Sequence, residues 1–364
     1  MLSRYAKRAA FSLGLAAACA ALALTAAMRP LHAQDAEEAP AAQEDALKKY
    51  EAQVDQAVER GLQYLAERQT ESGAFQSTWT DNTGVVSLCV MAFLARGHTP
   101  GDGPYGEVIN KGVDYVLDHS AKNGMLIGRN SQSGGMYSHS ISSLMLSEVS
   151  GMVNEERQRR IDEALPKALK IILSAQQVHK NAAHQGGWRY SSASRDSDIS
   201  CTGWPLMALR SARNSGAHVP REAIEDAVGF ILRCRNQDGG FGYVPGGSSG
   251  IARTRVGLLS LELCGHHDSA EARSAAEWIL KRPKPSWYYY GLYYCSQGMY
   301  QIGGDYWERY APLLYEDLLP RQAKDGSWPD NISSGSQRAG KAYSTAMAVL
   351  ALSVPYCQLP IYQR

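Results

Sequence analysis

Two aspartates placed just before an apolar stretch are the first residues of this chain that could carry acid chemistry. The segment Asp196-Ser197-Asp198-Ile199-Ser200-Cys201-Thr202 leads into a helix predicted over residues 199–212. A carboxylate at the start of a helix accepts hydrogen bonds from free backbone N–H groups and meets the positive end of the helix dipole. Asp198 is therefore either a capping residue or an acid that faces a ligand, and both interpretations stay open.

Polar side chains also stand near the starts of two other apolar stretches. His139 lies near the start of the first, where a structural, hydrogen-bonded histidine is the alternative to a ligand-binding one. Arg253 and Arg255 lie near the start of the second. Two cations at the positive end of a helix dipole are unfavourable unless an anion binds beside them. These arginines are therefore candidate anion ligands.

The run from Trp287 to Gln301 is unusually rich in aromatic residues, and it includes Tyr289. Aromatic residues at helical spacing commonly form a core, but each tyrosine hydroxyl needs a polar partner when it is buried. The run is therefore either core or the wall of a ligand cavity. The pair His266-His267 follows a helix end and has no third ligand at a suitable spacing, so no metal site is predicted there.

Amphipathic and apolar helices alternate along the chain and would hold these candidates in place. The amphipathic segments repeat apolar residues at i, i+3, i+4 and i+7, while their partners are apolar on every side and must be buried. The predicted pairs are 54–65 with 85–95, 108–119 with 136–149, 161–176 with 199–212, 221–235 with 251–264, 270–280 with 287–301, and a segment from 306 with 342–352. This pattern predicts an all-α fold of six helix hairpins.

Glycine-aromatic corners separate the two helices of several pairs. They are Gln69–Phe75, Gln185–Trp188, Gln237–Phe241 and Gln322–Trp328. A glycine can take a positive φ after a helix end, and the aromatic residue can then fold back on the helix. An open solenoid needs polar end caps, and neither the first nor the last apolar helix is polar. The hairpins are therefore expected to close into a ring with an inner and an outer layer.

With these repeats the chain resembles the terpenoid cyclase and protein prenyltransferase superfamily, whose fold is the (α/α)6 toroid. The corners look like the QW repeats of that superfamily, and the likeness runs from about Val54 to the end. More narrowly, the chain looks like exported bacterial proteins with prenyltransferase/squalene oxidase repeats, whose endings resemble the final segment 359–364. The resemblance implies a toroid over residues 50–364, but corner motifs say little about chemistry.

The cyclase motif is changed at its catalytic position. Such cyclases carry Asp-x-Asp-Asp-Thr at an inner helix, and the middle Asp protonates the substrate. When Thr202 is matched to the motif, Asp198 falls on the first Asp, Ser200 on the acid and Cys201 on the third position. A serine hydroxyl is too weak an acid for this protonation. A frame that starts at Asp196 loses the Thr match.

The zinc ligands of prenyltransferases are also changed. Asp198 and Trp204 keep the spacing of the Asp-x-Cys-Tyr-Ser-Phe-Trp segment, but Ser200 stands at the cysteine. In Tyr343-Ser344-Thr345, Ser344 stands at the histidine of the Tyr-His-Thr motif. Because two of the three ligands are replaced by hydroxyls, neither zinc nor another cofactor is expected.

The N-terminal part of the chain reads as a targeting segment. Residues 1–33 combine Arg4, Lys7 and Arg8 with an Ala/Leu-rich run, which is typical of a secretory signal peptide. An uncleaved membrane anchor is the alternative, because the apolar run approaches the length of a spanning helix. Residues 34–49 are Ala-rich and acidic, and a solvated leader is expected there. The chain is therefore expected to be exported, to the periplasm or beyond, with no membrane span after cleavage.

The net charge indicates which classes of partner to expect, and the cysteine positions indicate the state of the thiols. Four of the 37 Lys and Arg residues lie in residues 1–33, which carry no acid, so the rest of the chain is slightly acidic with its 36 Asp and Glu. A nucleic-acid partner is not expected. The six cysteines after residue 33 form no Cys-x-x-Cys pair and lie mostly in apolar helical segments, so buried free thiols are expected.

The sequence thus favours a toroid with a degenerate catalytic site that binds a small molecule with an anionic head and an apolar body. Lipid-like, glycan and polypeptide ligands all remain open. The alternative is an active enzyme, a cyclase, transferase, lyase or hydrolase that uses other residues than the family. The candidate binding residues are His139, Trp188, Asp198, Trp204, Arg253, Arg255, Trp287, Tyr289 and Tyr343, with Asp198 and Ser200 at the acid motif.

Overall fold

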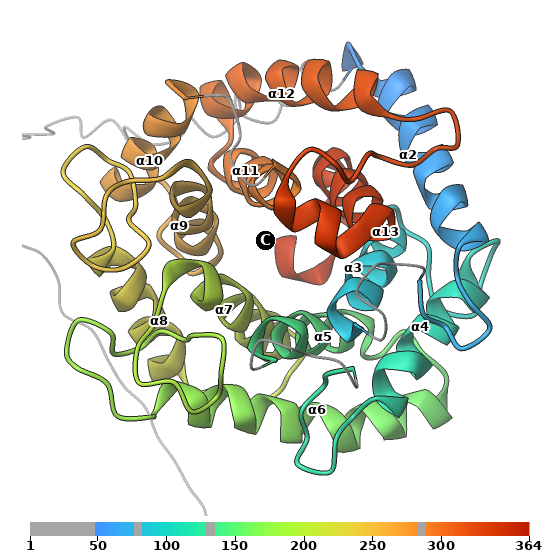
Figure 1. Ribbon diagram of the computed structural model, residues 1–364, viewed down its shortest axis with the longest axis horizontal. Coiled ribbons are helices and arrows are strands. Elements are labelled where there is room, and N and C mark those ends of the chain that lie inside the picture. Colours follow the sequence, from blue (N-terminus) through green and yellow to red (C-terminus); the bar gives the residue numbers. More distant parts are fainter. Residues whose placement is uncertain (1–47, 76–81, 129–134, 283–287, 364) are drawn as a thin grey trace, which may run out of the picture.

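The computed structural model describes residues 48–75, 82–128, 135–282 and 288–363, and the regular structure in these residues is helical. Figure 1 shows two concentric rings of helices. The outer ring consists of α2 (Glu51–Glu67), α4 (Gly106–Asp118), α6 (Glu155–Gln176), α8 (Arg221–Arg233), α10 (Ala270–Leu280) and α12 (Gly304–Leu318). The inner ring consists of α3 (Thr83–Leu94), α5 (Met136–Val149), α7 (Ile199–Asn214), α9 (Ile251–Leu263), α11 (Tyr288–Ile302) and α13 (Ser334–Leu352). The predicted (α/α)6 toroid is confirmed.

The two kinds of helix differ in how they are buried. An outer helix such as α4 buries one face, which carries Ile109, Val113 and Val116, and turns charged residues to solvent. Every residue of α3 is buried. An inner helix has neighbours on all sides, so its apolar residues need no stripe, whereas an outer helix must be amphipathic.

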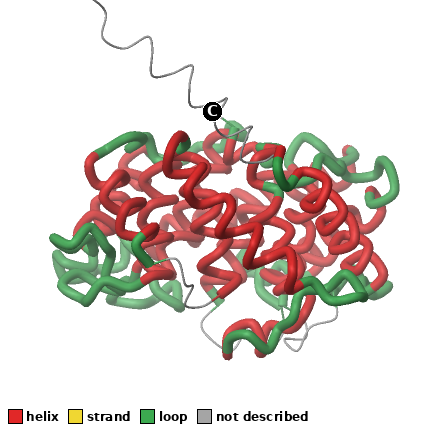
Figure 2. Tube along the Cα trace, turned by 90° about the horizontal axis from the view of Figure 1, so that it is seen from above, coloured by secondary structure: helices red, strands yellow, loops and turns green. Residues whose placement is uncertain are grey.

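Inner helices run side by side in the same direction. Each one packs against the next, and α13 packs against α3, so the inner ring is closed. Near their N-termini, Ser138 of α5 contacts Asn82 before α3 at 3.1 Å. Near their C-termini, Arg210 of α7 donates to the Leu263 carbonyl at the end of α9 at 2.9 Å. Figure 2 shows the helices spanning the distance between two faces that carry the loops.

At three corners a glutamine, Gln69, Gln176 or Gln322, bonds both its own corner and the next outer helix. Gln322 Nε2 donates to its own corner at Gly326 O (2.9 Å) and to Ala57 O of α2 (2.7 Å). Gly326 has a φ of 85°, and a Cβ at this position would lie 2.3 Å from Arg60 O of α2. Only glycine can take this conformation at such a distance without strain. This corner joins the last repeat to the first and closes the outer ring.

The third corner differs from the sequence interpretation. Gln176 at the end of α6, and not Gln185, donates to Gly186 O and to Ala223 O of α8, both at 2.8 Å. Ten residues separate this glutamine from its glycine, whereas four separate Gln322 from Gly326. An insertion therefore lies within the third corner. Gln185 directly precedes the glycine pair, so the sequence spacing alone points to it and not to Gln176.

The segment that follows α13 returns to the inner ring at the C-terminal ends of its helices. It contains the short helices η2 (Val354–Tyr356) and η3 (Pro360–Tyr362), whereas a third short helix, η1 (Leu319–Arg321), lies between α12 and α13. Figure 1 marks the end of the chain near the centre of the ring. Ile361 N donates to Glu148 Oε2 of α5 at 3.2 Å, and the hydroxyls of Tyr362 and Tyr293 lie 2.5 Å apart. This segment therefore covers that end of the inner ring.

Some sequence predictions fall on residues outside the described ranges. The signal peptide and nearly all of the acidic leader lie in residues 1–47, so both stay predictions. The six cysteines after residue 33 are free, as expected, and four of them are buried. In the ranges that the structure describes, no helix is long and apolar enough to span a membrane.

Candidate functional site: the N-terminal rim of the inner ring

Asp198 caps α7 at the rim where the inner helices begin. Its Oδ1 accepts a hydrogen bond from Cys201 N at 2.8 Å, and the residue is fully buried. Its Oδ2 lies 3.4 Å from Arg189 Nε. Burial raises the pKa of Asp198, while the Cys201 N–H and the Arg189 charge lower it. Asp198 therefore caps α7 through Oδ1, and its carboxylate does not reach the surface.

Arg189 and Arg253 lie on the ring of one tyrosine. Their guanidinium carbons are 5.4 Å and 5.6 Å from the ring centre of Tyr243, within the range of cation–π attraction. Arg189 is also paired with Asp196 at 3.2 Å. Arg253 donates to Ser248 O at 3.2 Å, and among the described residues no carboxylate forms an ion pair with it. Arg253 therefore offers a charge that a ligand could neutralise.

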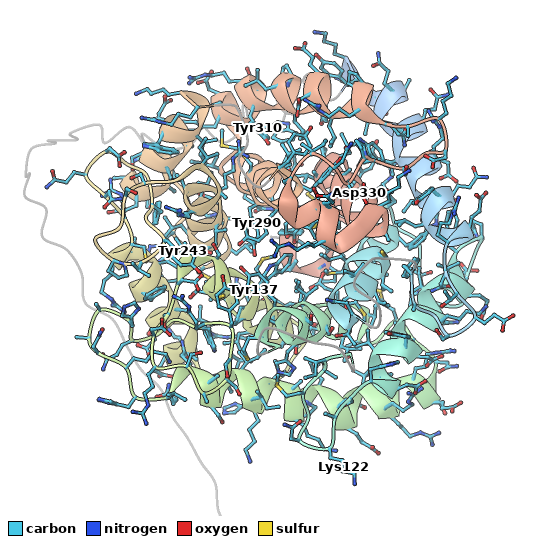
Figure 3. The ribbon with its side chains drawn as sticks, in the orientation of Figure 1. Lys122, Tyr137, Tyr243, Tyr290, Tyr310 and Asp330 are labelled. Atoms are coloured by element: carbon cyan, nitrogen blue, oxygen red, sulfur yellow. The ribbon has the colours of Figure 1, made fainter. Side chains whose placement is uncertain are left out.

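Further tyrosines extend this group around the rim. The hydroxyls of Tyr190 and Tyr243 lie 3.0 Å apart, and the rings of Tyr137 and Tyr190 stack at 5.8 Å. Tyr290 of α11 donates to the Ser200 carbonyl of α7 at 3.3 Å. Figure 3 shows Tyr137, Tyr243 and Tyr290 over the inner ring. We call Tyr137, Arg189, Tyr190, Ser200, Tyr243, Arg253 and Tyr290 the rim cluster; all are half-buried except Tyr190, which is exposed.

The rim cluster presents hydrogen-bond donors. Burial raises the pKa of Tyr137, Tyr243 and Tyr290 above the ordinary tyrosine value. These phenols are therefore neutral at pH 7 and keep their O–H groups. The half-buried Ser200 adds a neutral aliphatic hydroxyl to the cluster. Guanidinium and hydroxyl donors suit an anionic group. Of the two carboxylates beside the cluster, Asp198 is fully buried, while Asp196 is half exposed and paired with Arg189.

His139 lies between the two rings and not at the rim. It is fully buried, with Nδ1 accepting from Leu126 N at 3.0 Å and Nε2 facing Ala168 O of α6 at 3.1 Å. Burial lowers its pKa to about 4. In the third repeat Thr202 Oγ1 takes the same role by accepting from Trp188 N at 3.1 Å. His139 is therefore placed as the corner-holding side chain of its repeat, and it does not join the rim cluster.

Three other predicted residues are buried in structural contacts. Trp188 is 1% exposed and donates from Nε1 to Ile172 O of α6 at 2.8 Å. Trp204 stacks on Tyr293 in the middle of the inner ring, with ring centres 5.4 Å apart. Tyr289 donates to Pro329 O, in the loop before α13, at 2.7 Å. The structure does not bring these side chains into the rim cluster.

Arg255 is separated from Arg253 by the turn of α9. It is fully buried, and its charge opposes the burial that raises the pKa of Cys295 in α11 and of Tyr310 in α12. Tyr310 lies between the rings in Figure 3. Residues two apart on a helix point to different sides, so Arg255 does not lie beside Arg253 at the rim.

Three residues singled out in the sequence remain to be placed: Tyr343, Ser344 and Trp287. Tyr343 is half-buried on α13, three residues after the kink at Gly340, and burial raises its pKa. Ser344, at the position of the zinc-binding histidine, is fully buried. Trp287 lies outside the described residues. Within the described part of the chain no group of three or more His, Cys, Asp or Glu side chains has the arrangement of a metal site.

Sequence reasoning missed Arg189, Tyr190 and Tyr243. Tyr190 and Tyr243 each stand two residues after the aromatic residue of a corner, Trp188 and Phe241. Because that aromatic residue turns back into the core, the residue two positions later returns to the rim beside the next inner helix. This offset was the available signal.

The sequence model of a protein family, the prenyltransferase alpha-alpha toroid domain, matches residues 45–292 of this chain. A comparison with curated proteins gives no match. Among solved structures, a variant of the type II terpene cyclase MstE from Scytonema in complex with merosterolic acid A aligns with a TM-score of 0.58 at 14% identity, over 86% of this chain and 100% of that one.

Two further solved structures broaden the comparison. An α-1,6-mannanase from Salegentibacter aligns with a TM-score of 0.61 at 9% identity, over 84% of this chain and 99% of that one. A protein from Actinoplanes aligns with a TM-score of 0.51 at 15% identity, over 83% and 99%. Identities this low show a shared fold and leave the chemistry to be argued from the site.

Proposed function

Because the chain belongs to the prenyltransferase alpha-alpha toroid family, we propose that it binds a ligand at the N-terminal rim of its inner ring and does not act there as an acid catalyst. The observation that carries this proposal is the contrast between two residues of the acid motif. Asp198 is fully buried and caps α7, while Ser200, whose backbone carbonyl accepts from Tyr290, is half-buried and carries only a hydroxyl. A buried capping carboxylate at 198 and a neutral hydroxyl at 200 do not supply the acid of the motif, and the half-exposed Asp196 is paired with Arg189.

The chemistry of the rim cluster favours an anionic head on an apolar body. Arg253 has no carboxylate partner among the described residues, and helix N-termini favour negative charge beside it. The faces of Tyr137 and Tyr290 would contact the apolar part. A phosphate or carboxylate attached to a hydrocarbon chain combines these two features.

Calorimetry with three related probes tests this proposal. Dodecyl phosphate below its micellar concentration is expected to bind more tightly than dodecanol or inorganic phosphate, because only this probe uses both the donors and the aromatic faces. Arg253→Gln should weaken dodecyl phosphate about tenfold, the equivalent of about 1.4 kcal/mol. Arg159→Gln is the control, because Arg159 is an exposed arginine of α6.

Two results would contradict the proposal. One is the absence of dodecyl phosphate binding to the wild-type protein. The other is turnover of a polyprenyl diphosphate or a glycan that Asp198→Asn abolishes, which would support the alternative of an active enzyme.

We further propose that the protein is exported with residues 1–33 removed. The charged start and the apolar run of this segment support the proposal. N-terminal sequencing of the protein recovered from a secreting host should begin at Gln34. A mature chain that keeps Met1 would favour the uncleaved anchor.

A further inference from the structure

A polar cleft of about 430 Å³ lies at the third corner, apart from the rim cluster. Its walls come from the end of α6, the inserted loop and α8, and its lining includes Gln176, His179, Lys180, Asp226, Gly229 and Arg233. This volume is within the range of small-molecule sites. None of the rim residues lines it.

The inserted loop is held firmly against its surroundings. Lys180 is 3% exposed and its Nζ donates to Ala175 O and Gln176 O, both at 3.0 Å, which caps the C-terminal end of α6. A cation at this end of a helix is favoured by the dipole. His184 accepts at Nδ1 from Ser197 N at 3.0 Å, and Ser197 Oγ donates to His184 O at 2.8 Å. The cleft is therefore pre-organised.

Gly229 opens the cleft without a packing reason of its own. It lies inside α8, where glycine is less favourable than alanine. A Cβ added there would meet only Arg233 Nη1, at 3.5 Å, whereas a Cβ at Gly257 of α9 would meet the Phe241 ring at 2.8 Å. Packing thus explains Gly257 but not Gly229. The missing side chain leaves space over the surface of α8.

Gln176 leaves a hydrogen-bond acceptor in the wall. The residue is 4% exposed, and its amide nitrogen donates hydrogen bonds to Gly186 O and Ala223 O. Its Oε1 is buried and has no hydrogen-bond partner within the part of the chain that the structure describes. A buried acceptor of this kind is costly unless a donor reaches it. Gln176 therefore adds to the lining of the cleft a polar residue with one unused acceptor.

We propose that this cleft is a second binding site, for a small neutral ligand with several hydroxyl groups, of the class of a mono- or disaccharide. The cations Lys180 and Arg233 are balanced by Glu225 and Asp226, so the wall does not select a charged ligand. Val178 is its one apolar side chain, so a hydrocarbon body would gain little there. Amide, carboxylate and guanidinium groups together offer both donors and acceptors to vicinal hydroxyls.

Calorimetry and saturation-transfer NMR on the full chain test this site with D-glucose, D-mannose and maltose as probes. At least one probe should bind with a Kd of about 1 mM or tighter. Gly229→Gln places a side chain in the cleft and should weaken this binding at least about tenfold. The variant should not lower the Tm, because glutamine is a better helix former than glycine.

Glu222→Gln is the matched control, since it places the same new side chain on the exposed first turn of α8 and does not line the cleft. It should leave sugar binding unchanged. The proposal is overturned if no probe binds up to about 50 mM, or if Gly229→Gln binds sugar as well as the wild type. Binding that Arg253→Gln removes and Gly229→Gln does not would place the sugar at the rim and also reject this site.

Discussion

At the scale of single residues, Glu148 gives the inner ring a pH-dependent stability. It is 1% exposed, and it accepts hydrogen bonds from Ser211 Oγ and Ile361 N. Burial raises its pKa to about 7 from 4.5. Folding therefore favours the protonated carboxyl, so this contribution is complete below about pH 4.5 and is lost as the pH rises through 7. The loss is on the order of 3 kcal/mol.

The comparison of wild type with Glu148→Gln isolates this residue. Between pH 5 and pH 8 the wild-type free energy of unfolding, measured with urea, should fall relative to the variant, because glutamine stays neutral. His139 acts in the opposite sense at lower pH, since its depressed pKa of about 4 removes stability as the pH falls below 6.5; the difference between the two proteins cancels this effect. Glu163→Gln, at an exposed site of α6, is the control. Parallel pH profiles of wild type and Glu148→Gln would contradict the assignment.

The residues of the site were only partly predictable from the sequence. Capping by Asp198 followed from its position before an apolar helix, because that preference depends on the local backbone alone. The position of Arg253 at the rim followed from its place at the start of the helix, but the same argument misplaced Arg255, because it locates the helix end and not the direction of a side chain. Tyr243 and Arg189 come together through loops that no periodicity describes.

At the scale of elements, the helices could be predicted because the spacing of their apolar residues indicates which faces are buried. The outer helices have one apolar face, whereas the inner helices are apolar on all sides, as the burial of α4 and α3 confirms. The contacts of the corners were harder to predict from the sequence. Gln176 was missed because the insertion separates it from Gly186, and His139 was a ligand candidate because its corner-holding role depends on Leu126 and Ala168, which are distant in sequence.

Replacement of His139 tests this element-scale interpretation. His139→Ala leaves the Leu126 N–H and the Ala168 carbonyl without their partners and opens a cavity between α5 and α6. We expect a loss of about 3 kcal/mol in urea unfolding, with dodecyl phosphate binding at 25 °C unchanged. Ser138→Ala, one residue earlier, should cost less than about 1 kcal/mol because Ser138 makes one half-buried contact. A stable His139→Ala protein that no longer binds dodecyl phosphate would show that His139 belongs to the binding site.

At the scale of the whole molecule, closure depends on a seam between the last repeat and the first. Besides Gln322 and Gly326, Arg60 Nη2 of α2 donates to Ala323 O at 2.7 Å, and Tyr50 donates to Glu316 of α12 at 2.8 Å. These contacts join parts of the chain that are more than 260 residues apart. Sequence repeats predicted that closure was favoured, because both end helices are apolar. They did not identify the seam, since the same corner motif serves the internal joints.

Substitution at the seam shows whether closure stabilises the ring. Gly326→Ala places a Cβ 2.3 Å from Arg60 O at a φ of 85°, so it must strain the corner or push α2 away. Gly216→Ala is the matched control, because Gly216 has a φ of 90° with no atom within 4 Å of the added Cβ, and it should cost only the backbone term of about 1 kcal/mol. Gly326→Ala should lose at least about 2 kcal/mol more, and hydrogen exchange should rise in α2 and α12 before the other helices, since a broken seam frees the two end elements first. Equal losses for the two variants, with exchange unchanged in α2, would mean that the ring holds its shape without this joint.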